Sequence, residues 1–222
     1  LNFYMPVAYK CKNYRYDIPF GTIDREDMDG DVPANSWAAA LPLDQNKKGI
    51  MLVTDSKYGF RGTQDALAIT LIRSSFDPDP YPEIGIHKFK FGVCPVTFDN
   101  NKDLIAKAYD YNHEFSVVST SIHEGVLSTA GSFLTLEKGD VVISGIKMTE
   151  SSEDGRDKLI IRVYETEGNS TKAVIRLFKE ASKAYYTDIN ENKTDLSGVV
   201  LDGKTIEFTV SPYSIANICV EF

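Results

Sequence analysis

The stretch Ile50–Gly59 reads IMLVTDSKYG, and the interpretation of the whole chain starts from it. Its first half, Ile50–Thr54, is an apolar run that is typical of a buried strand. Its second half is a polar turn that carries a carboxylate, an ammonium group and a phenol, on Asp55, Lys57 and Tyr58. A buried strand that delivers such groups to a sheet edge indicates a candidate binding site, although ordinary turns have the same composition.

The same strand signal recurs along the chain. Short runs of β-branched and aromatic residues alternate with Gly, Asp, Asn and Pro. In Thr205–Val210 the apolar residues Ile206, Phe208 and Val210 fall on one face of an extended chain. We expect strands near residues 3–9, 14–19, 36–43, 50–54, 66–73, 85–93, 116–120, 141–147, 158–165, 172–179, 183–187, 199–201, 205–210 and 215–221. The sequence therefore predicts a mainly β protein.

One segment breaks the β pattern. In Asn101–His113 the residues Leu104, Ile105, Ala108 and Tyr111 recur with helical spacing. Asparagine or aspartate at residues 99–101 is suited to cap the N-terminus, and an acidic residue in the first turn favours the helix dipole. We expect a single short helix here.

Two domains are expected, over residues 1–137 and 138–222. The stretch Leu136–Asp140, LEKGD, is a candidate boundary, because compact strands with regular turn signals follow it. About 80 residues of this kind fit a small β-sandwich. The earlier part has longer connections, among them the proline-rich segment Ser74–Glu83, which is unsuited to a central strand.

Composition excludes several classes of partner. The formal net charge of −8 argues against nucleic acid and against an anionic membrane, since both attract basic surfaces. No apolar run approaches the roughly 18 residues that cross a bilayer. Cys11, Cys94 and Cys219 are too few and too scattered for a disulfide framework or a zinc motif. Free thiols predict a reducing compartment, and we expect a cytoplasmic location.

A search for catalytic chemistry finds no motif that could act alone. The acidic stretch Asp24–Asp31 fails the EF-hand spacing, so a solvated loop is expected there rather than a calcium site. Asp77 and Asp79 could form the carboxylate pair of a glycosidase, but two residues on an extended loop fix no separation. His87 is expected to have a structural role. The opening strand also suggests a fragment of a longer polypeptide.

Several ordered segments resemble the C-terminal β region of family 38 α-mannosidases. Residues Tyr16–Arg25, YDIPFGTIDR, are similar to that family's DIPFG-x-I-x-R segment, and Leu52–Gly59 is similar to its LNDSKYG segment. Further along, Gly85-x-His87-x-Phe89 and the RVYE of residues 162–165, followed by Gly168, also match in order. The resemblance covers nearly the whole chain, and it implies a mainly β fold with a large antiparallel, supersandwich-like β-sandwich followed by a small C-terminal β-sandwich. The Asp55-Ser56 pair resembles the bacterial, fungal-vacuolar and cytosolic branch, because the lysosomal and Golgi branch tends to have Asp-Arg there.

The resemblance implies a parent enzyme that hydrolyses terminal α-mannosides with retention. Such enzymes use two carboxyl groups and a divalent metal, usually zinc. In the family these groups come from an N-terminal α/β barrel that precedes a helical bundle. No segment of this chain matches those motifs, so we assign it no catalytic residue, metal or other cofactor and expect the fragment alone to be inactive. The implied partners are the catalytic and helical domains of the same polypeptide and a mannose-containing carbohydrate.

The family's β region packs on the barrel and sends loops to the rim of the active site. On this basis Asp55, Lys57 and Tyr58 are the predicted substrate-binding residues. Asp55 would accept a sugar hydroxyl or pair with Lys57, and Tyr58 would stack or hydrogen-bond. Alternatively, Asp55 caps the turn and Tyr58 fills a domain interface. A stand-alone carbohydrate-binding module, an assembly domain and a homo-oligomer also remain open.

Overall fold

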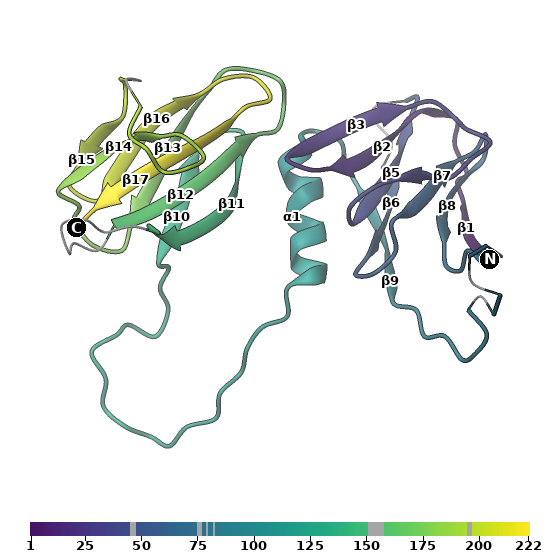
Figure 1. The fold of residues 1–222 in the computed structure, drawn as a ribbon, viewed down its shortest axis with the longest axis horizontal. Helices are drawn as coiled ribbons and strands as arrows, with labels where there is room; N and C mark the ends of the chain where they lie inside the picture. The colour runs from purple at the N-terminus through teal and green to yellow at the C-terminus, as the bar shows by residue number, and fades with distance from the viewer. Residues whose placement is uncertain (45–47, 75–76, 79, 82, 151–157, 195–196) are drawn as a thin grey trace. The chain divides into compact units, whose positions relative to one another are not determined.

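The computed structural model describes residues 1–44, 48–74, 77–78, 80–81, 83–150, 158–194 and 197–222. Its contacts divide the chain into two compact units, Leu1–Phe115 and Ser116–Phe222 (Figure 1). Each unit has its own buried apolar core. The described strand pairs are antiparallel in both units. The predicted fold class, mainly β with sandwich domains and one short helix, is confirmed.

Unit 1 is built from two sheets. One sheet has the order β1 (Asn2–Pro6), β8 (Ala66–Thr70), β7 (Gly59–Gly62) and β4 (Val32–Pro33). The other has the order β3 (Gly21–Arg25), β2 (Cys11–Ile18), β5 (Trp37–Pro42), β6 (Gly49–Thr54) and β9 (Phe91–Val96). The core between them combines Tyr14, Tyr16 and Leu52 of the second sheet with Phe60 and Ile69 of the first.

Strands β5 and β6, in the interior of the five-stranded sheet of unit 1, are buried on both faces. Ala38 and Leu52 belong to the core between the sheets, while Trp37 and Val53, one residue away on each strand, point to the opposite face. Trp37 and Val53 are nevertheless fully buried. The helix α1 (Asn101–Asn112) packs on β6 and supplies cover for this sheet. This explains why IMLVT is continuously apolar rather than alternating.

Helix α1 agrees with the helix predicted for Asn101–His113. Asn100 caps it, because its side-chain Oδ1 accepts a hydrogen bond of 2.8 Å from the backbone N–H of Asp103. The buried residues of the helix include Leu104, Ile105 and Ala108, which are three of the four apolar residues in the predicted pattern. Local spacing and a local cap therefore specify this element.

Unit 2 is a sandwich of two four-stranded sheets. The first has the order β10 (Leu134–Lys138), β13 (Thr171–Leu177), β16 (Thr205–Val210) and β15 (Val200–Asp202). The second has the order β11 (Val141–Met148), β12 (Lys158–Glu165), β17 (Ile215–Glu221) and β14 (Lys183–Thr187). Ile206, Phe208 and Val210 all lie in the core, as their alternation predicts.

Two expectations differ from the observed strands. No strand forms over residues 116–120, where Val117 and Val118 are almost fully exposed. The segment has strand-forming residues but no partner strand, and a strand needs one to satisfy its backbone. The strand expected over residues 85–93 begins only at Phe91.

The stretch Leu136–Asp140 lies inside unit 2, where it forms the end of β10 and the turn that follows at Gly139 and Asp140. β10 begins before residue 137 and pairs with β13, while β11 begins at Val141 in the facing sheet. Gly139 has a φ of +114° and links the two sheets, which accounts for the turn signal in the sequence. The division into compact units therefore falls earlier in the chain, at residues 115 and 116.

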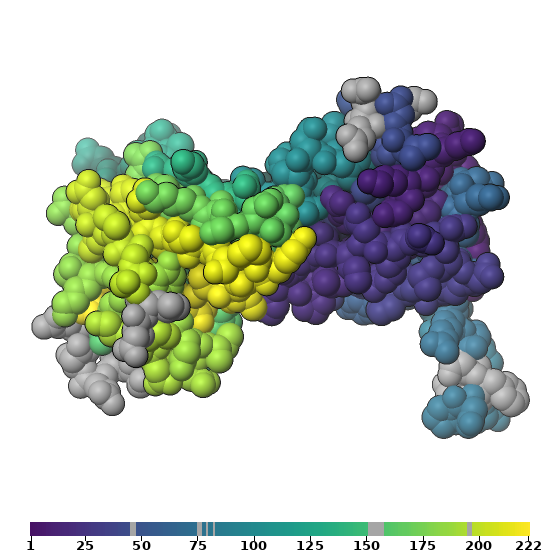
Figure 2. All heavy atoms as spheres, turned by 90° about the horizontal axis from the view of Figure 1, so that it is seen from above, coloured from purple at the N-terminus to yellow at the C-terminus, as the bar shows by residue number. Residues whose placement is uncertain are grey.

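The connection between β8 and β9 stands away from the sheets of unit 1 (Figures 1 and 2). Its described residues include Tyr81, Ile84 and Ile86, whose side chains are strongly exposed. None of the helical residues that the structure describes forms a helix long and apolar enough to cross a membrane.

Candidate functional site

The polar turn after β6 is held by the last residue of that strand. Thr54 is buried, and its Oγ1 accepts the backbone N–H groups of Ser56 at 3.3 Å and Lys57 at 3.2 Å. Asp55 instead accepts a hydrogen bond of 2.8 Å from the Ser56 hydroxyl and is exposed. The capping role considered for Asp55 is thus taken by Thr54.

Lys57 and Tyr58, which are consecutive in this turn, make different contacts. The Lys57 ammonium lies 4.8 Å from the centre of the Phe89 ring, a cation–π contact. The Tyr58 carbonyl accepts the backbone N–H of Ala34 at 3.0 Å, so the turn is fixed to the chain after β4. The Tyr58 side chain is 63% exposed and its ring is open to a ligand.

The contact between Lys57 and Phe89 joins two motifs that are far apart in the sequence. β6 and β9 are antiparallel neighbours, with Thr54 opposite Phe91, so the segment before β9 lies next to the DSKYG turn. Phe89 also stacks with His87, with ring centres 6.1 Å apart and planes 3° apart. His87 Nε2 is 2.8 Å from the Glu83 carbonyl oxygen, which fits a structural role.

A pocket of about 630 Å³ opens beside the turn. Its lining combines the turn with β4, the end of β8 and the loop that follows, and consists of Asp31, Val32, Pro33, Ser56, Lys57, Tyr58, Gly59, Thr70, Leu71, Arg73 and Glu83. Of the three predicted site residues, Lys57 and Tyr58 line this pocket and Asp55 does not. The volume is in the usual range for small-molecule sites.

Asp31 is the most firmly held polar group of the pocket. Its Oδ1 accepts from Arg61 Nε at 3.0 Å, and its Oδ2 accepts from the Thr70 hydroxyl at 2.6 Å. At the other end of the acidic stretch, Asp24 Oδ1 pairs with Arg15 Nε at 2.7 Å. These carboxylates are therefore used in ion pairs within unit 1.

Sequence reasoning missed Asp31, Thr70, Arg73 and Glu83 as pocket residues. Asp31 precedes β4, Thr70 ends β8, and Arg73 and Glu83 lie in the connection that follows β8. Their proximity depends on β4, β7 and β8 pairing in one sheet. The available signal was that two polar loops flank strands next to the DSKYG turn. Only the order in which the strands pair in the sheet brings these two loops together at one pocket.

The described part of the chain contains no group of three or more His, Cys, Asp or Glu side chains that could hold a metal ion. The residues present therefore do not fit a zinc site, and no chemical step is assigned to a metal here. Of the carboxyl pair considered in the proline-rich loop, Asp79 lies outside the described residues.

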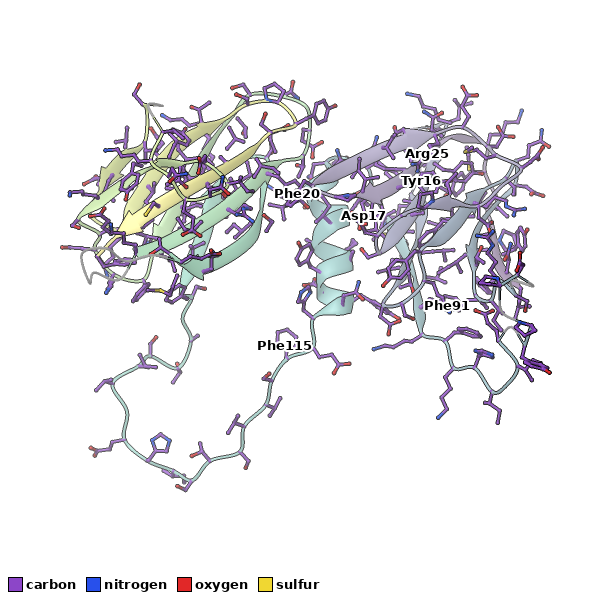
Figure 3. The ribbon with its side chains drawn as sticks, viewed as in Figure 1. Tyr16, Asp17, Phe20, Arg25, Phe91 and Phe115 are labelled. Atoms are coloured by element: carbon purple, nitrogen blue, oxygen red, sulfur yellow. The ribbon has the colours of Figure 1, made fainter. Side chains whose placement is uncertain are left out.

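A second polar cluster of unit 1 surrounds Asp17 (Figure 3). Its Oδ2 accepts from the Ser36 hydroxyl at 2.7 Å and from the Ser36 backbone N–H at 3.1 Å. Burial raises the pKa of Asp17 to about 6, against the lowering effect of these two hydrogen bonds. The Asp17 charge also helps to raise the pKa of Tyr109 on α1, after burial. Nearby, the Arg25 guanidinium lies 4.9 Å from the Tyr16 ring centre.

The RVYE motif of unit 2 has a structural explanation. Glu165 is fully buried, and its carboxylate accepts three backbone N–H groups, from Glu167 at 2.6 Å, Gly168 at 2.8 Å and Tyr213 at 2.9 Å. One carboxylate thus joins the turn after β12 to the turn before β17. Gly168 has a φ of +77°, and a side chain there would meet the Tyr213 ring.

The pocket in unit 1 is suited to a neutral molecule with several hydroxyl groups. Lys57 and Arg73 supply donors, Asp31 and Glu83 supply acceptors, and the exposed Tyr58 ring supplies an apolar face. A sugar ring presents this combination of hydroxyl groups and C–H faces. The arrangement can bind and orient such a molecule.

Comparisons with protein families match both units of the chain. The model of the glycosyl hydrolases family 38 C-terminal domain matches residues 1–81, and that of the family 38 C-terminal beta sandwich domain matches residues 140–218. The chain belongs to the C-terminal region of this family.

The curated relatives are α-mannosidases. Human alpha-mannosidase 2C1 is 23% identical over 222 residues, which covers 96% of this chain and 21% of the human protein. Alpha-mannosidase G of Dictyostelium discoideum is 28% identical over 174 residues, or 73% of this chain and 15% of that protein. The alpha-mannosidase of Saccharomyces cerevisiae is 26% identical over 140 residues, or 57% and 12%. The chain therefore spans about a fifth or less of the length of these relatives.

Proposed function

We propose that this chain is the non-catalytic C-terminal β portion of an α-mannosidase. In this role it supports a catalytic barrel supplied by the same polypeptide and adds the pocket of unit 1 to the rim of the substrate site. Lys57 and Tyr58 contact the carbohydrate directly, and Asp55 contributes from the exposed edge of the same turn. The observation that carries the proposal is the family membership of both units together with the exposed Tyr58 in a polar pocket.

The proposed parent enzyme hydrolyses terminal α-mannosides with retention of configuration. Its nucleophile, general acid and zinc ion belong to the catalytic barrel, and a helical bundle connects the barrel to this chain. The branch resemblance of the Asp55-Ser56 pair supports a cytoplasmic enzyme, as do the free thiols of Cys11, Cys94 and Cys219.

The coding sequence upstream of Leu1 provides the first test. We expect it to encode an α/β barrel with His and Asp metal ligands, and a reading frame without one refutes the proposal. The isolated chain should not hydrolyse an aryl α-mannoside in the presence of zinc. Clear turnover by the purified chain would contradict the non-catalytic role.

The rim contact is tested in the complete enzyme by Tyr58→Ala. Loss of one aromatic contact should raise KM for an α-mannoside about tenfold and leave kcat nearly unchanged, because the ring binds substrate away from the reacting atoms. Tyr81→Ala is the matched control, since Tyr81 is also exposed but does not line the pocket. Equal KM values for the wild type and Tyr58→Ala would remove the rim contact from the proposal.

A stand-alone carbohydrate-binding module is the second candidate. The favouring observation is that every residue of the pocket belongs to unit 1, so the pocket needs no other domain. Titration of methyl α-mannoside into the labelled chain distinguishes the two. Saturable NMR chemical-shift changes around Tyr58 in the chain alone, without the catalytic domain, support a carbohydrate-binding module. Binding that is detected only in the complete enzyme supports the rim role. Sedimentation of the same sample tests whether the chain forms a homo-oligomer.

A further inference from the structure

The connection between α1 and β10 exposes a dense run of apolar side chains. Within it, Phe115–Leu127 reads FSVVSTSIHEGVL and starts just after the end of α1 (Figure 3). The large apolar side chains of this stretch are each at least 85% exposed, namely Phe115, Val117, Val118, Ile122, Val126 and Leu127. Apolar residues scattered singly over a surface are ordinary, but a run of this density indicates an interaction surface.

The composition of Phe115–Leu127 is closer to that of a strand than to that of a linker. Its serines would suit a linker, but it contains no proline, no Lys and no Arg, and Val, Thr and Ile dominate residues 117–122. Among the described residues, it forms no helix and pairs with no strand. A segment with strand-forming side chains and unpaired backbone groups is suited to extend the edge of another sheet.

This segment begins beside the DSKYG turn. Glu114, the residue before it, has its Oε1 3.6 Å from Lys90 Nζ, and the Lys90 ammonium lies 5.3 Å from the centre of the Tyr111 ring. The pKa of Tyr111 is raised first by burial and then by the charge of Asp55. The last turn of α1, the start of the segment and the DSKYG turn therefore lie together at one end of unit 1.

The rest of the same polypeptide is a better partner for the segment than a second copy of this chain. The chain spans about a fifth or less of the length of its curated relatives, so most of a polypeptide of that kind lies outside it. A partner within one polypeptide is present at a high effective concentration. Two copies of this chain each carry a formal net charge of −8 and repel one another.

We propose that Phe115–Leu127 docks as an added β-strand on a sheet edge of the part of the polypeptide that carries the catalytic site. The proposal rests on the proposed function, which supplies that part of the polypeptide. Val118, Ile122 and Val126 are spaced by even numbers of residues, so they share one face of a strand and cover apolar surface of the partner. Because the segment starts beside the DSKYG turn, its docking holds that turn at the rim of the substrate site.

Hydrogen exchange followed by mass spectrometry tests the docking in the purified chain and in the complete polypeptide. Amides of an unpaired segment exchange quickly, and strand pairing slows them. Peptides that cover residues 115–127 should exchange within seconds in the chain alone and on the order of a hundredfold more slowly in the complete polypeptide. Peptides from β12 are the internal reference, because β12 is already paired on both sides in the chain alone.

Ile122→Asp is the variant that should break the docking. A carboxylate is costly to bury in place of an apolar side chain, so protection of residues 115–127 in the complete polypeptide should fall about tenfold or more. In the chain alone the Ile122 side chain is fully exposed, so its replacement should leave the melting temperature unchanged. Thr129→Asp adds the same charge at an exposed position outside Phe115–Leu127, and this matched control should keep the protection.

The outcomes separate the docking from the proposed function. Equal exchange of residues 115–127 in the two samples overturns the docking, and so does a complete reading frame that encodes nothing beyond this chain. Protection in the chain alone that rises with its concentration assigns the segment to a second copy and also overturns it. Activity on an aryl α-mannoside is the separate readout of the proposed function. An active enzyme with an unprotected segment contradicts the docking alone, whereas an inactive polypeptide with a protected segment contradicts the proposed function and supports docking on the rest of the polypeptide.

Discussion

At the scale of single residues, Asp17 makes the stability of unit 1 depend on pH. Burial raises the pKa of its carboxyl from 3.8 to about 6. The folded chain then binds this proton more tightly than the unfolded chain does. The protonated Asp17 carboxyl therefore contributes its full stabilisation of unit 1 below pH 3.8, and this stabilisation is lost as the pH rises through 6. A difference of this size amounts to about 3 kcal/mol.

We expect Asp17→Asn to flatten this part of the pH profile and to stabilise unit 1 at pH 7. The amide oxygen can still accept the bonds from Ser36, and it does not titrate. Urea unfolding followed by fluorescence of Trp37 reports on unit 1 alone, because Trp37 is the one tryptophan of the chain and lies in β5. Asp110→Asn, on the exposed face of α1, is the control. If the unfolding free energy of Asp17→Asn depended on pH as steeply as that of the wild type, the raised pKa of Asp17 would be contradicted.

Sequence reasoning at this scale identified side chains better than their roles. Lys57 and Tyr58 line the pocket as a substrate site requires, and the carbohydrate role itself stays a prediction. Thr54 was not singled out, because a threonine at the end of an apolar run looks like one more strand residue. Asp31 was noticed only as part of an acidic stretch. Its partners Arg61 and Thr70 are 30 and 39 residues away, and no local pattern encodes them.

At the scale of elements, α1 is a structural part of the sandwich of unit 1. Leu104 is fully buried and faces the sheet that carries Trp37. Leu104→Ala leaves a cavity under the helix, and we expect unit 1 to lose about 2–5 kcal/mol of unfolding free energy. The measurement is urea unfolding followed by Trp37 fluorescence.

Lys107→Ala is the matched control for this prediction. Lys107 is exposed on the same helix, and alanine is a good helix former, so the change should stay within about 0.5 kcal/mol. A loss of less than about 1 kcal/mol in Leu104→Ala would mean that α1 does not stabilise the sheet.

Elements with local determinants were predictable, and elements that depend on partners were not. α1 has its apolar spacing and its cap within about a dozen residues. The strand expected over residues 116–120 has suitable residues, but strand formation depends on a neighbour that the sequence does not reveal. From the sequence, the LEKGD stretch is expected to be a boundary between two domains. Its position between two sheets of one unit, rather than between two domains, depends on the pairing of β10 with β13.

At the scale of the whole molecule, two separate cores predict two separable units. Residues 116–133 contain no helix or strand and are exposed. We expect brief digestion with chymotrypsin to cut first at Phe115, Leu127 or Phe133. Mass spectrometry should then identify a stable fragment of each unit. Trypsin is the control, because residues 116–133 contain no Lys or Arg.

Fragments of unit 2 that disappear as soon as the segment is cut would contradict independent folding. In that case the core of unit 2 would be insufficient by itself. Persistence of both fragments would instead allow the two units to be studied in separate proteins.

The Glu165 carboxylate limits where unit 2 can be engineered. It bonds to backbone groups in two turns, one that contains Glu167 and Gly168 and one that contains Tyr213. Peptide tags, circular permutation and fluorescent-protein insertions usually target such exposed turns. An insertion in either turn would disturb the hydrogen bonds of the Glu165 carboxylate, and this carboxylate holds both turns. The turn at Gly203 and Lys204, between β15 and β16, has no part in this anchor and is the better position for a fusion.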